Sequence, residues 1–369
     1  DGVNDDTVKV RVFAVEMVFV PTASFYVGDG TTNLVQGQFH YASSTTTPFQ
    51  ITSEEALTLG GTAPGNVGNN SRIGMTDVRD DFDNVIIQTL PESFPKGYSA
   101  FYCMKYEITQ EQYADFLNCL TSTQAATRNP AASTNRYSIT GSHPNFSSST
   151  PFVACNFLSW MDGAAYADWA ALRPMTELEF EKACRGNQFP VANEFAWGTT
   201  GIAGSVYTLV NAGAANEGIA TNYATTLGDG NISYNITDGS INGPLRVGIF
   251  SGNANNTTDN RVRSGAGFYG VMEMSGNLFE RSVTIGNSDG RDFTGTLGDG
   301  TLSANGNATN SDWPGEVGGE VTGASGSGFR GGSWNNNSTN ARVSDRNNAS
   351  NTNTNRNNNI GFRCVRPGP

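Results

Sequence analysis

Thiols and imidazoles offer the widest chemistry of any side chains, and this sequence holds few of them. The two histidines are His40 and His143, and the five cysteines are Cys103, Cys119, Cys155, Cys184 and Cys364. No two cysteines have Cys-x-x-Cys or similar metal spacing, and their odd number leaves at least one thiol unpaired within the chain. We expect Cys103, Cys119 and Cys155 to be buried apolar residues and both histidines to lie at the surface.

The second unusual feature is an asparagine-rich tract, residues 335–359. Twelve of its 25 positions are asparagine, namely Asn335, Asn336, Asn337, Asn340, Asn347, Asn348, Asn351, Asn353, Asn355, Asn357, Asn358 and Asn359. Such a composition usually indicates a loop or disorder, because Asn is a poor strand former and a middling helix former. Apolar residues flank and interrupt the tract, however, at Trp334, Val343, Ile360 and Phe362. They predict a folded scaffold that presents an irregular polar surface.

Composition narrows the classes of function. The net charge is −12, with 22 Lys and Arg against 34 Asp and Glu, so a basic face for nucleic acid is not expected. No apolar run reaches the roughly 18 residues that cross a bilayer. A charged fraction of 15% with 44 glycines is typical of a loop-rich globular protein. The sequence begins at Asp1 without methionine, as expected of a processed chain.

Local patterns predict a few regular elements. Residues 17–20 and 25–27 are expected to pair as strands, and 101–108 to form another. Capping boxes at Thr109 and Thr176 predict two helices, the second ending at Gly186, and a further helix is expected at about 156–171. We expect residues 1–14 to form an N-terminal strand or extension. Residues 15–369 would form one domain with insertions at about 30–95, 199–260 and 285–328.

Several motifs, in order along the chain, resemble the sulfatase-modifying-factor, or formylglycine-generating-enzyme, family. They are Met-Val-Phe-Val-Pro at 17–21, Phe-Tyr-Val-Gly at 25–28, Tyr-Glu-Ile-Thr at 106–109, Arg-Pro-Met-Thr-Glu-Leu-Glu-Phe at 173–180, Trp-Gly at 197–198, Tyr-Gly at 269–270, Gly-Asn-Leu-Phe-Glu at 276–280, Arg-Gly-Gly-Ser-Trp at 330–334 and Gly-Phe-Arg at 361–363. The resemblance implies an α+β, C-type-lectin-like fold of the formylglycine-generating-enzyme type, loop-rich with long insertions. It also implies a disulfide between Cys184 and Cys364, which would contribute roughly 3–5 kcal/mol and favour an oxidising compartment.

Catalysis is not expected. Oxygen-dependent enzymes of the family use two cysteines shortly after the Gly-Gly-Ser-aromatic motif, and those positions fall near Asn336 and Ala341. Neither residue can supply a thiolate nucleophile or a soft metal ligand. The related sulfoxide synthases need three histidines around iron, and this chain has two. A metal-dependent oxidase with a rebuilt site remains the alternative, as does a structural subunit of a surface filament or phage-like particle.

The tract resembles, more narrowly, the variable proteins of diversity-generating retroelements, whose templates carry many Asn codons because adenines are mutated. The resemblance implies a variable region at about 330–364, with the twelve asparagines as diversifiable ligand-binding positions on a fixed backbone. The partner would be a protein or glycan on another cell or surface, and the location extracellular or at the cell surface. A plain solvated or prion-like loop is the competing interpretation, and assembly into a homo-oligomer stays open.

A calcium site also follows from the resemblance. The family binds a structural Ca²⁺ through two side chains and two backbone carbonyls, and Glu273, Gly276, Leu278 and Glu280 occupy those positions here. Carboxylate and carbonyl oxygens suit Ca²⁺. Glu273 replaces the usual Asp or Asn, so a surface carboxylate pair without an ion is the alternative.

Overall fold

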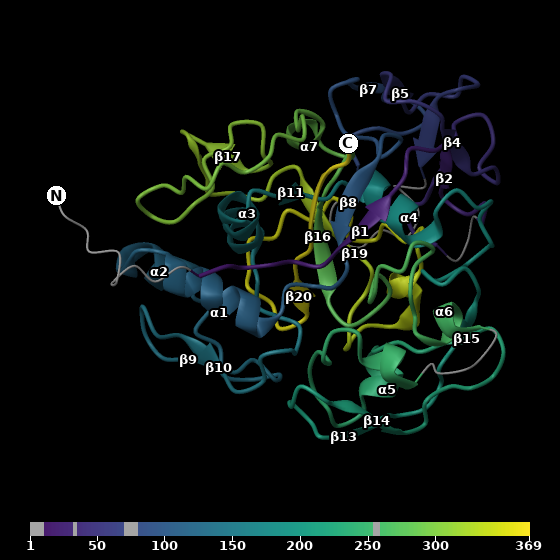
Figure 1. Ribbon diagram of the computed structural model, residues 1–369. Helices are drawn as coiled ribbons and strands as arrows, with labels where there is room; N and C mark the ends of the chain where they lie inside the picture. The colour runs from purple at the N-terminus through teal and green to yellow at the C-terminus, as the bar shows by residue number, and fades with distance from the viewer. Residues whose placement is uncertain (1–10, 32–34, 70–79, 254–258) are drawn as a thin grey trace.

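The computed structural model describes residues 11–31, 35–69, 80–253 and 259–369. Short helices and strands are joined by long loops into a mixed α+β body (Figure 1). Most of the predicted N-terminal strand lies outside the described residues, and residues 11–16 belong to no strand. The helices are α1 (Gln110–Cys119), α2 (Ser122–Arg128), α3 (Trp160–Trp169), α4 (Glu177–Arg185), α5 (Asn235–Asp238), α6 (Asn260–Arg263) and α7 (Ser288–Arg291), with 3₁₀ turns at η2 (Ile249–Asn253) and η3 (Ser338–Ala341).

Capping boxes start the four longer helices. The predicted boxes of Thr109 before α1 and Thr176 before α4 are both present, and Gly186 ends α4 with a positive φ of 66°. The third predicted helix, α3, begins later than expected because Ser159 and Asp162 form its capping box. Helix α2 was not predicted, although Thr121 and Gln124 form the same local signature before it. These starts depend on contacts within one helical turn.

Two sheets form the centre of the molecule. The first has the order β1 (Met17–Val20), β8 (Phe101–Met104), β21 (Cys364–Pro367) and β11 (Arg173–Pro174), and the second has the order β19 (Ser327–Arg330), β16 (Phe279–Val283) and β20 (Ile360–Gly361). Strand β16 pairs antiparallel with β19 and parallel with β20. The two strands that bracket the asparagine-rich tract therefore lie on either side of one buried strand.

The predicted pairing of residues 17–20 with 25–27 is wrong. Strand β1 pairs with β8 instead, and β2 pairs with β4. The link between β1 and β2 makes a long-range bond, Ala23 N–H to the Tyr98 carbonyl at 3.1 Å, and so carries the chain from one sheet to another. The remaining small sheets are β2 (Phe25–Val27) with β4 (Phe49–Ile51); β3 (Phe39–Tyr41), β6 (Val67–Asn69), β5 (Leu57–Leu59) and β7 (Gln88–Leu90); β9 (Ile139–Thr140) with β10 (Ser147–Ser148); β12 (Gly201–Ile202) with β15 (Asp229–Gly230); β13 (Thr208–Val210) with β14 (Gly218–Thr221); and β17 (Glu316–Val317) with β18 (Glu320–Val321).

Two expectations about thiols and imidazoles need correction. Cys103 and Cys155 are buried as predicted, but Cys119 is exposed at the end of α1. His40, predicted at the surface, is buried in β3, where its Nδ1 lies 2.8 Å from the Tyr41 carbonyl oxygen. His143 is partly exposed. That residues 30–95, 199–260 and 285–328 are insertions stays a prediction.

The predicted disulfide between Cys184 and Cys364 is wrong, because all five cysteines are free thiols. Successive side chains of a strand point to opposite faces of its sheet. In β21, Val365 packs into the apolar cluster that contains Cys184, whereas Cys364 packs into the cluster on the other face, with Met104. The sheet itself therefore separates the two sulfurs, and the argument for an oxidising compartment that rested on this bond falls with it.

None of the helices in the described ranges is long and apolar enough to cross a membrane.

Candidate functional site

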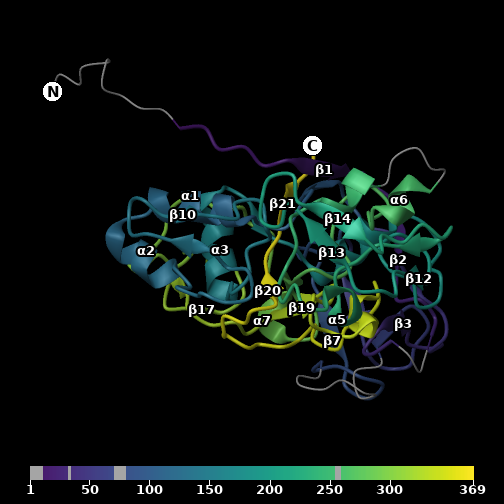
Figure 2. The same cartoon turned by 90° about the horizontal axis from the view of Figure 1, so that it is seen from below.

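The asparagine-rich tract is an ordered, irregular segment. Within residues 335–359, all of which the structure describes, the single turn η3 is the regular element. The tract leaves the second sheet after β19 and returns to it at β20, so both ends are fixed by strand β16. In Figure 2 most of the yellow segments lie along one side of the molecule, and β21 runs from there to the C-terminus, which lies with β1 on the opposite side.

Burial within the tract follows residue type. None of the twelve asparagines is buried, and Asn335, Asn337 and Asn355 are exposed to solvent. The buried positions are all other residue types, namely Ala341, Val343, Ser344, Asp345, Arg346, Ala349 and Ser350. The tract therefore contains two sets of positions, one that points outward and one that packs against the scaffold.

Arg346 anchors the middle of the tract in the protein interior. Its guanidinium is fully buried and forms ion pairs with Asp80 at 2.6 Å and Glu177 at 2.7 Å. The ring of Phe39 lies 3.9 Å from the guanidinium carbon, which adds a cation–π contact. Burial alone would raise the pKa of Glu177, but Arg346 and Arg330 hold that pKa below its ordinary value.

The same carboxylate connects the tract to the residue that precedes it. Arg330 donates to Glu177 at 2.9 Å, to Glu181 at 2.7 Å and to the Val343 carbonyl at 2.8 Å. Helix α4 thus supplies two carboxylates that bind arginines from both the start and the middle of this segment. The Thr176 capping box fixes the residue at which α4 begins, and Glu177 and Glu181 lie in the helix that follows.

A third arginine holds the last part of the tract. Arg356 donates to both oxygens of Asp162 at 2.7 Å and to the carbonyls of Asn129 and Thr127. Asp162 is the N3 residue of the capping box of α3 and is fully buried. The sequence shows that arginine recurs among the asparagines. It does not show the acidic partners of Arg346 and Arg356, which lie more than 150 residues away in the chain.

Backbone hydrogen bonds fix the tract independently of its side chains. The scaffold N–H groups of Phe157, Phe279 and Phe329 donate to the carbonyls of Asn357, Asn359 and Asn348, and the tract N–H groups of Val343 and Arg346 donate to the carbonyls of Glu194 and Gln36. Trp334 adds an indole bond to the Asn358 carbonyl at 3.2 Å. Because these bonds use main-chain atoms of the tract, they do not depend on which side chain stands at an asparagine position.

The asparagine side chains from the two ends of the tract meet on the surface. The Asn359 amide donates to Asn335 at 3.0 Å and to Asn336 at 3.1 Å. Further amide contacts join Asn337 to Asn235 and Asn358 to Asn135. Positions separated by more than 20 residues therefore form one continuous amide patch, with neighbouring residues of the scaffold at its edge.

Asp345 carries the strongest pH dependence within the tract. Burial raises its pKa to about 6, with partial compensation from the Asn347 N–H and the Asn340 amide. A raised folded-state pKa means that the folded protein holds the proton more tightly than the unfolded chain. Its contribution to stability is therefore complete below about pH 4 and is lost as the pH rises to 6.

We expect Asp345→Asn, which mimics the protonated acid, to raise the free energy of unfolding at pH 7.5 by about 2–3 kcal/mol, since two pKa units correspond to about 3 kcal/mol. The substitution should also reduce the loss of folding stability that we expect between pH 4 and pH 6. Denaturant unfolding at four pH values measures both effects, with the exposed Asp292→Asn as control. A loss of stability at pH 7.5 would contradict the prediction.

Comparison with known proteins assigns the chain to a family. The sequence matches the Sulfatase-modifying factor enzyme 1-like domain over residues 88–367. The chain belongs to this family. Its mixed α+β structure is the C-type-lectin-like fold of formylglycine-generating enzymes, rich in loops.

Several solved structures are similar to this chain at low identity. PvdO from Pseudomonas aeruginosa is 16% identical, with a TM-score of 0.41 over 96% of this chain and 95% of that one. Treponema denticola variable protein 1 is 14% identical, with a TM-score of 0.42 over 95% of each chain. The Major Tropism Determinant U1 variant is 14% identical, with a TM-score of 0.30 over 99% of this chain and 88% of that one. No curated protein matches the sequence.

The positions expected to hold the family's catalytic cysteines lie within the tract. Asn336 is partly exposed and contributes to the amide patch, and Ala341 is buried at the end of η3. Four of the cysteines of this family member are buried, and burial raises the pKa of each of these thiols, so they are poor nucleophiles at neutral pH. At these two positions the chain therefore has a partly exposed amide and a buried methyl group.

The predicted calcium ligands are engaged with protein groups. Both oxygens of Glu280 accept from Arg363, at 2.7 and 2.9 Å, so a buried guanidinium already balances that carboxylate. Glu273 accepts the Gly248 N–H at 2.8 Å through Oε1, and its Oε2 has no partner among the described residues. Both carboxylates are buried, so the alternative of a surface pair is wrong. In this arrangement the group does not fit Ca²⁺, which needs six to eight oxygens, and calcium binding stays a prediction.

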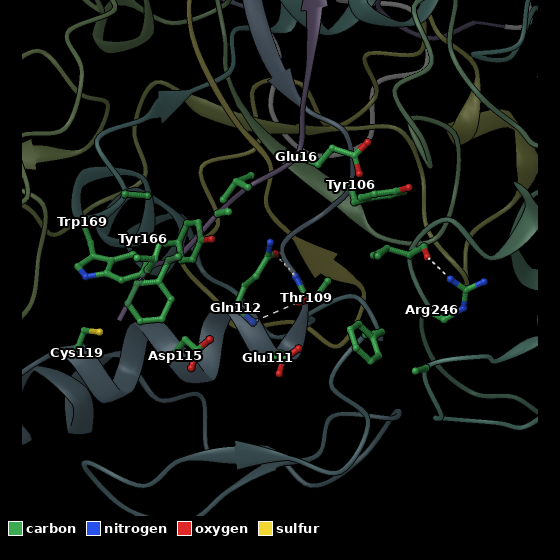
Figure 3. A pocket seen from close by; sticks show the side chains of 18 residues that line it. Glu16, Tyr106, Thr109, Glu111, Gln112, Asp115, Cys119, Tyr166, Trp169 and Arg246 are labelled. Carbon is green, nitrogen blue, oxygen red and sulfur yellow. Dashed lines mark hydrogen bonds between the residues drawn. The ribbon is translucent and has the colours of Figure 1, made fainter. Parts of the chain in front are cut away.

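A separate hollow lies outside the tract. A cavity of about 840 Å³ opens between α1, α3 and residues 12–16, and none of its lining residues belongs to the tract. Figure 3 shows Asp115, Cys119, Tyr166 and Trp169 at one end of it and Arg246 at the other. The sequence contained no motif that marked this cavity, because its walls come from six separate segments of the chain.

Proposed function

We propose that residues 335–359 form a diversifiable recognition surface on a non-catalytic ligand-binding or display protein. The target would be a protein or glycan on another cell or surface, and the protein would act outside the cell or at the cell surface. Retroelement-directed mutation of adenines in the Asn codons would supply the diversity. Twelve positions, those of the asparagines, would vary.

One observation carries the proposal: every asparagine of the tract is at least partly exposed, and every buried position holds another residue type. Asparagine is usually exposed in any loop, and what supports the proposal is that all twelve asparagines avoid the seven packed positions of the tract. Varying the exposed set changes the surface, while the buried set and the main-chain bonds keep the backbone in place. This is the division of roles that binding loops on rigid scaffolds use.

The chemistry of the present side chains supports weak binding at most. Asparagine offers amide donors and acceptors but little apolar area. Binding energy in protein interfaces is concentrated in Trp, Tyr and Arg side chains. We therefore infer that this sequence lies close to an undiversified state, and that versions with aromatic residues at Asn335, Asn336 or Asn359 would bind more tightly.

The triple variant Asn335→Tyr, Asn337→Tyr and Asn355→Tyr is expected to change the free energy of unfolding by less than about 1 kcal/mol, since exposed substitutions usually have small effects. All three positions are exposed. The matched control is Ala349→Tyr, a single change in the same tract at a fully buried position. Overpacking there should cost about 3 kcal/mol or prevent folding. Equal losses of stability for the triple variant and for Ala349→Tyr in denaturant unfolding would contradict the distinction between exposed and packed positions of the tract.

A second experiment addresses diversification directly. Sequencing the same locus from sister isolates should reveal substitutions concentrated at the twelve asparagine positions, with Arg346, Trp334 and Phe362 unchanged. Substitutions spread evenly over the tract would overturn the proposal. A neighbouring reverse transcriptase gene with a near-duplicate template would support it.

A metal-dependent oxidase is not favoured. The residues near the expected cysteine positions are Asn336 and Ala341, and neither can act as a nucleophile or soft metal ligand. Assays for oxygen consumption with thiol-containing peptides would reveal such an activity if the site had been rebuilt elsewhere.

A further inference from the structure

The cavity of about 840 Å³ beside α1 has walls of an unusual composition. Five aromatic residues line it, namely Phe13, Tyr106, Phe152, Tyr166 and Trp169. At one end the Trp169 ring contacts two of the others, with centroid distances of 5.5 Å to Phe13 and 5.6 Å to Tyr166. The faces and edges of these rings form an apolar recess that a small ligand could occupy.

Acidic side chains lie along the floor of the same cavity. Glu111, Asp115 and Cys119 are spaced four residues apart on α1, so they project from one face of the helix into the cavity. Figure 3 shows Asp115 and Cys119 close to the Trp169 end. Glu16, on the opposite wall, is paired with Lys105 at 2.6 Å, whereas Glu111 and Asp115 form no ion pair with any described residue.

Asp115 is the acidic residue of this cavity on which the argument for a cationic ligand depends. It is half-buried, and it makes no hydrogen bond or ion pair within the part of the chain that the structure describes. Burial raises its pKa, and Arg11, on the exposed N-terminal segment, opposes that shift from a distance. A carboxylate that is partly removed from water is stabilised by a nearby positive charge, so a cationic ligand in the cavity would add to the effect of Arg11.

Apart from Arg11, the cations around the cavity are engaged with other groups. Arg246 lies at the other end of the cavity and donates to the carbonyls of Glu217 and Val247. Lys105 is occupied by Glu16. An anionic ligand would be repelled by Glu111 and Asp115, and a neutral apolar ligand would desolvate Asp115 further without compensation.

We propose that this cavity binds a small organic ammonium ion. Its apolar substituents would pack against Phe13, Tyr166 and Trp169, and its charge would lie between these rings and the Asp115 carboxylate. Aromatic faces attract such cations through their negative potential, and a nearby carboxylate adds a direct charge interaction. No residue of the tract lines the cavity, so this inference is independent of the recognition surface proposed above.

Choline and its uncharged isostere 3,3-dimethylbutan-1-ol distinguish charge recognition from apolar binding. Titration of the full chain by calorimetry, with Trp169 fluorescence as a second readout, should give at least about tenfold tighter binding of choline. Propylammonium, a primary ammonium, tests whether the methyl groups matter. Equal affinity for choline and the neutral isostere, or binding of neither ammonium at millimolar concentration, would overturn the proposal.

Two substitutions should act in opposite directions. Asp115→Asn removes the carboxylate and should weaken choline binding about tenfold, while Arg11→Gln removes the opposing charge and should strengthen it. The matched control is Asp292→Asn, an exposed carboxylate outside the cavity. Thermal unfolding of each variant verifies that it is folded. Unchanged binding in Asp115→Asn contradicts the assignment even if choline binds.

Cys119 provides a chemical probe inside the cavity, because the other four cysteines are buried. Its thiolate attacks a methanethiosulfonate reagent, forming a mixed disulfide and releasing methanesulfinate. The trimethylammonium-ethyl reagent should modify Cys119 about tenfold faster than the sulfonate-ethyl reagent relative to their rates with free cysteine. Asp115→Asn should remove most of this preference, and Cys119→Ser should abolish labelling. A faster reaction with the anionic reagent would contradict the proposal.

Discussion

Replacing Arg346 with leucine is expected to lower the free energy of unfolding by about 3–5 kcal/mol, because removing one partner leaves buried charges unpaired. Asp80 would lose its arginine, and Glu177 would keep only Arg330. Arg346 and Glu177 are fully buried, so water could not replace the lost bonds. Denaturant unfolding at pH 7.5 measures the effect.

Two further variants separate this effect from a general intolerance of the tract to change. Asn347→Leu, at the adjacent and partly exposed position, should cost less than about 1 kcal/mol. The double variant Arg346→Leu with Asp80→Asn should recover part of the lost free energy of unfolding, because it also removes the buried negative charge that Arg346 neutralised. If Arg346→Leu cost no more than Asn347→Leu, the ion-pair network would not be what holds the tract.

Phe362→Ala is expected to cost about 3–5 kcal/mol, the range for deleting a large aromatic side chain from a packed core. The ring is fully buried, lies 5.7 Å from the Trp160 ring and fills the space above Gly163, where a Cβ atom would come within 1.8 Å of it. Gly163 therefore leaves room for this ring, which any side chain at position 163 would displace. Denaturant unfolding measures the loss.

Phe362→Leu is the matched control for this position, and it should cost clearly less than the alanine variant because most of the volume is kept. Proteolysis of the folded protein gives a second readout. Since Phe362 follows the tract by three residues, its loss should expose bonds within residues 335–359 to cleavage at lower protease concentration. Similar stability of the alanine variant and the parent chain would contradict the assigned anchoring role.

Local interactions explain where sequence reasoning succeeded. The capping boxes of Thr109 and Thr176 predicted α1 and α4 because a cap and its partner lie three residues apart. Thr121 and Gln124 carry the same local signal for the start of α2. The apolar residues Val343, Ile360 and Phe362 correctly indicated that the asparagine-rich tract is folded, since each is buried.

Predictions from the sequence failed where a residue or strand contacts a partner that is distant along the chain. Nothing near β1 or β2 in the sequence shows that one pairs with β8 and the other with β4. The disulfide between Cys184 and Cys364 was expected from a resemblance, yet one residue of strand alternation places the two sulfurs on opposite faces of a sheet. Calcium binding stays a prediction, but the sequence did not show that Arg363 donates to both oxygens of Glu280, one of the predicted ligands.

By itself the sequence determined the family motifs, the starts of the main helices and the presence of a polar tract between two folded flanks. Only the tertiary structure decided which side of that tract faces water. It brought Asp80, Glu177 and Asp162 beneath the arginines of the tract, and it joined α1, α3 and the N-terminal segment around an aromatic and acidic cavity. The reason is physical: caps and turns depend on neighbours within about four residues, whereas burial and ion pairing depend on which distant segments the fold places together.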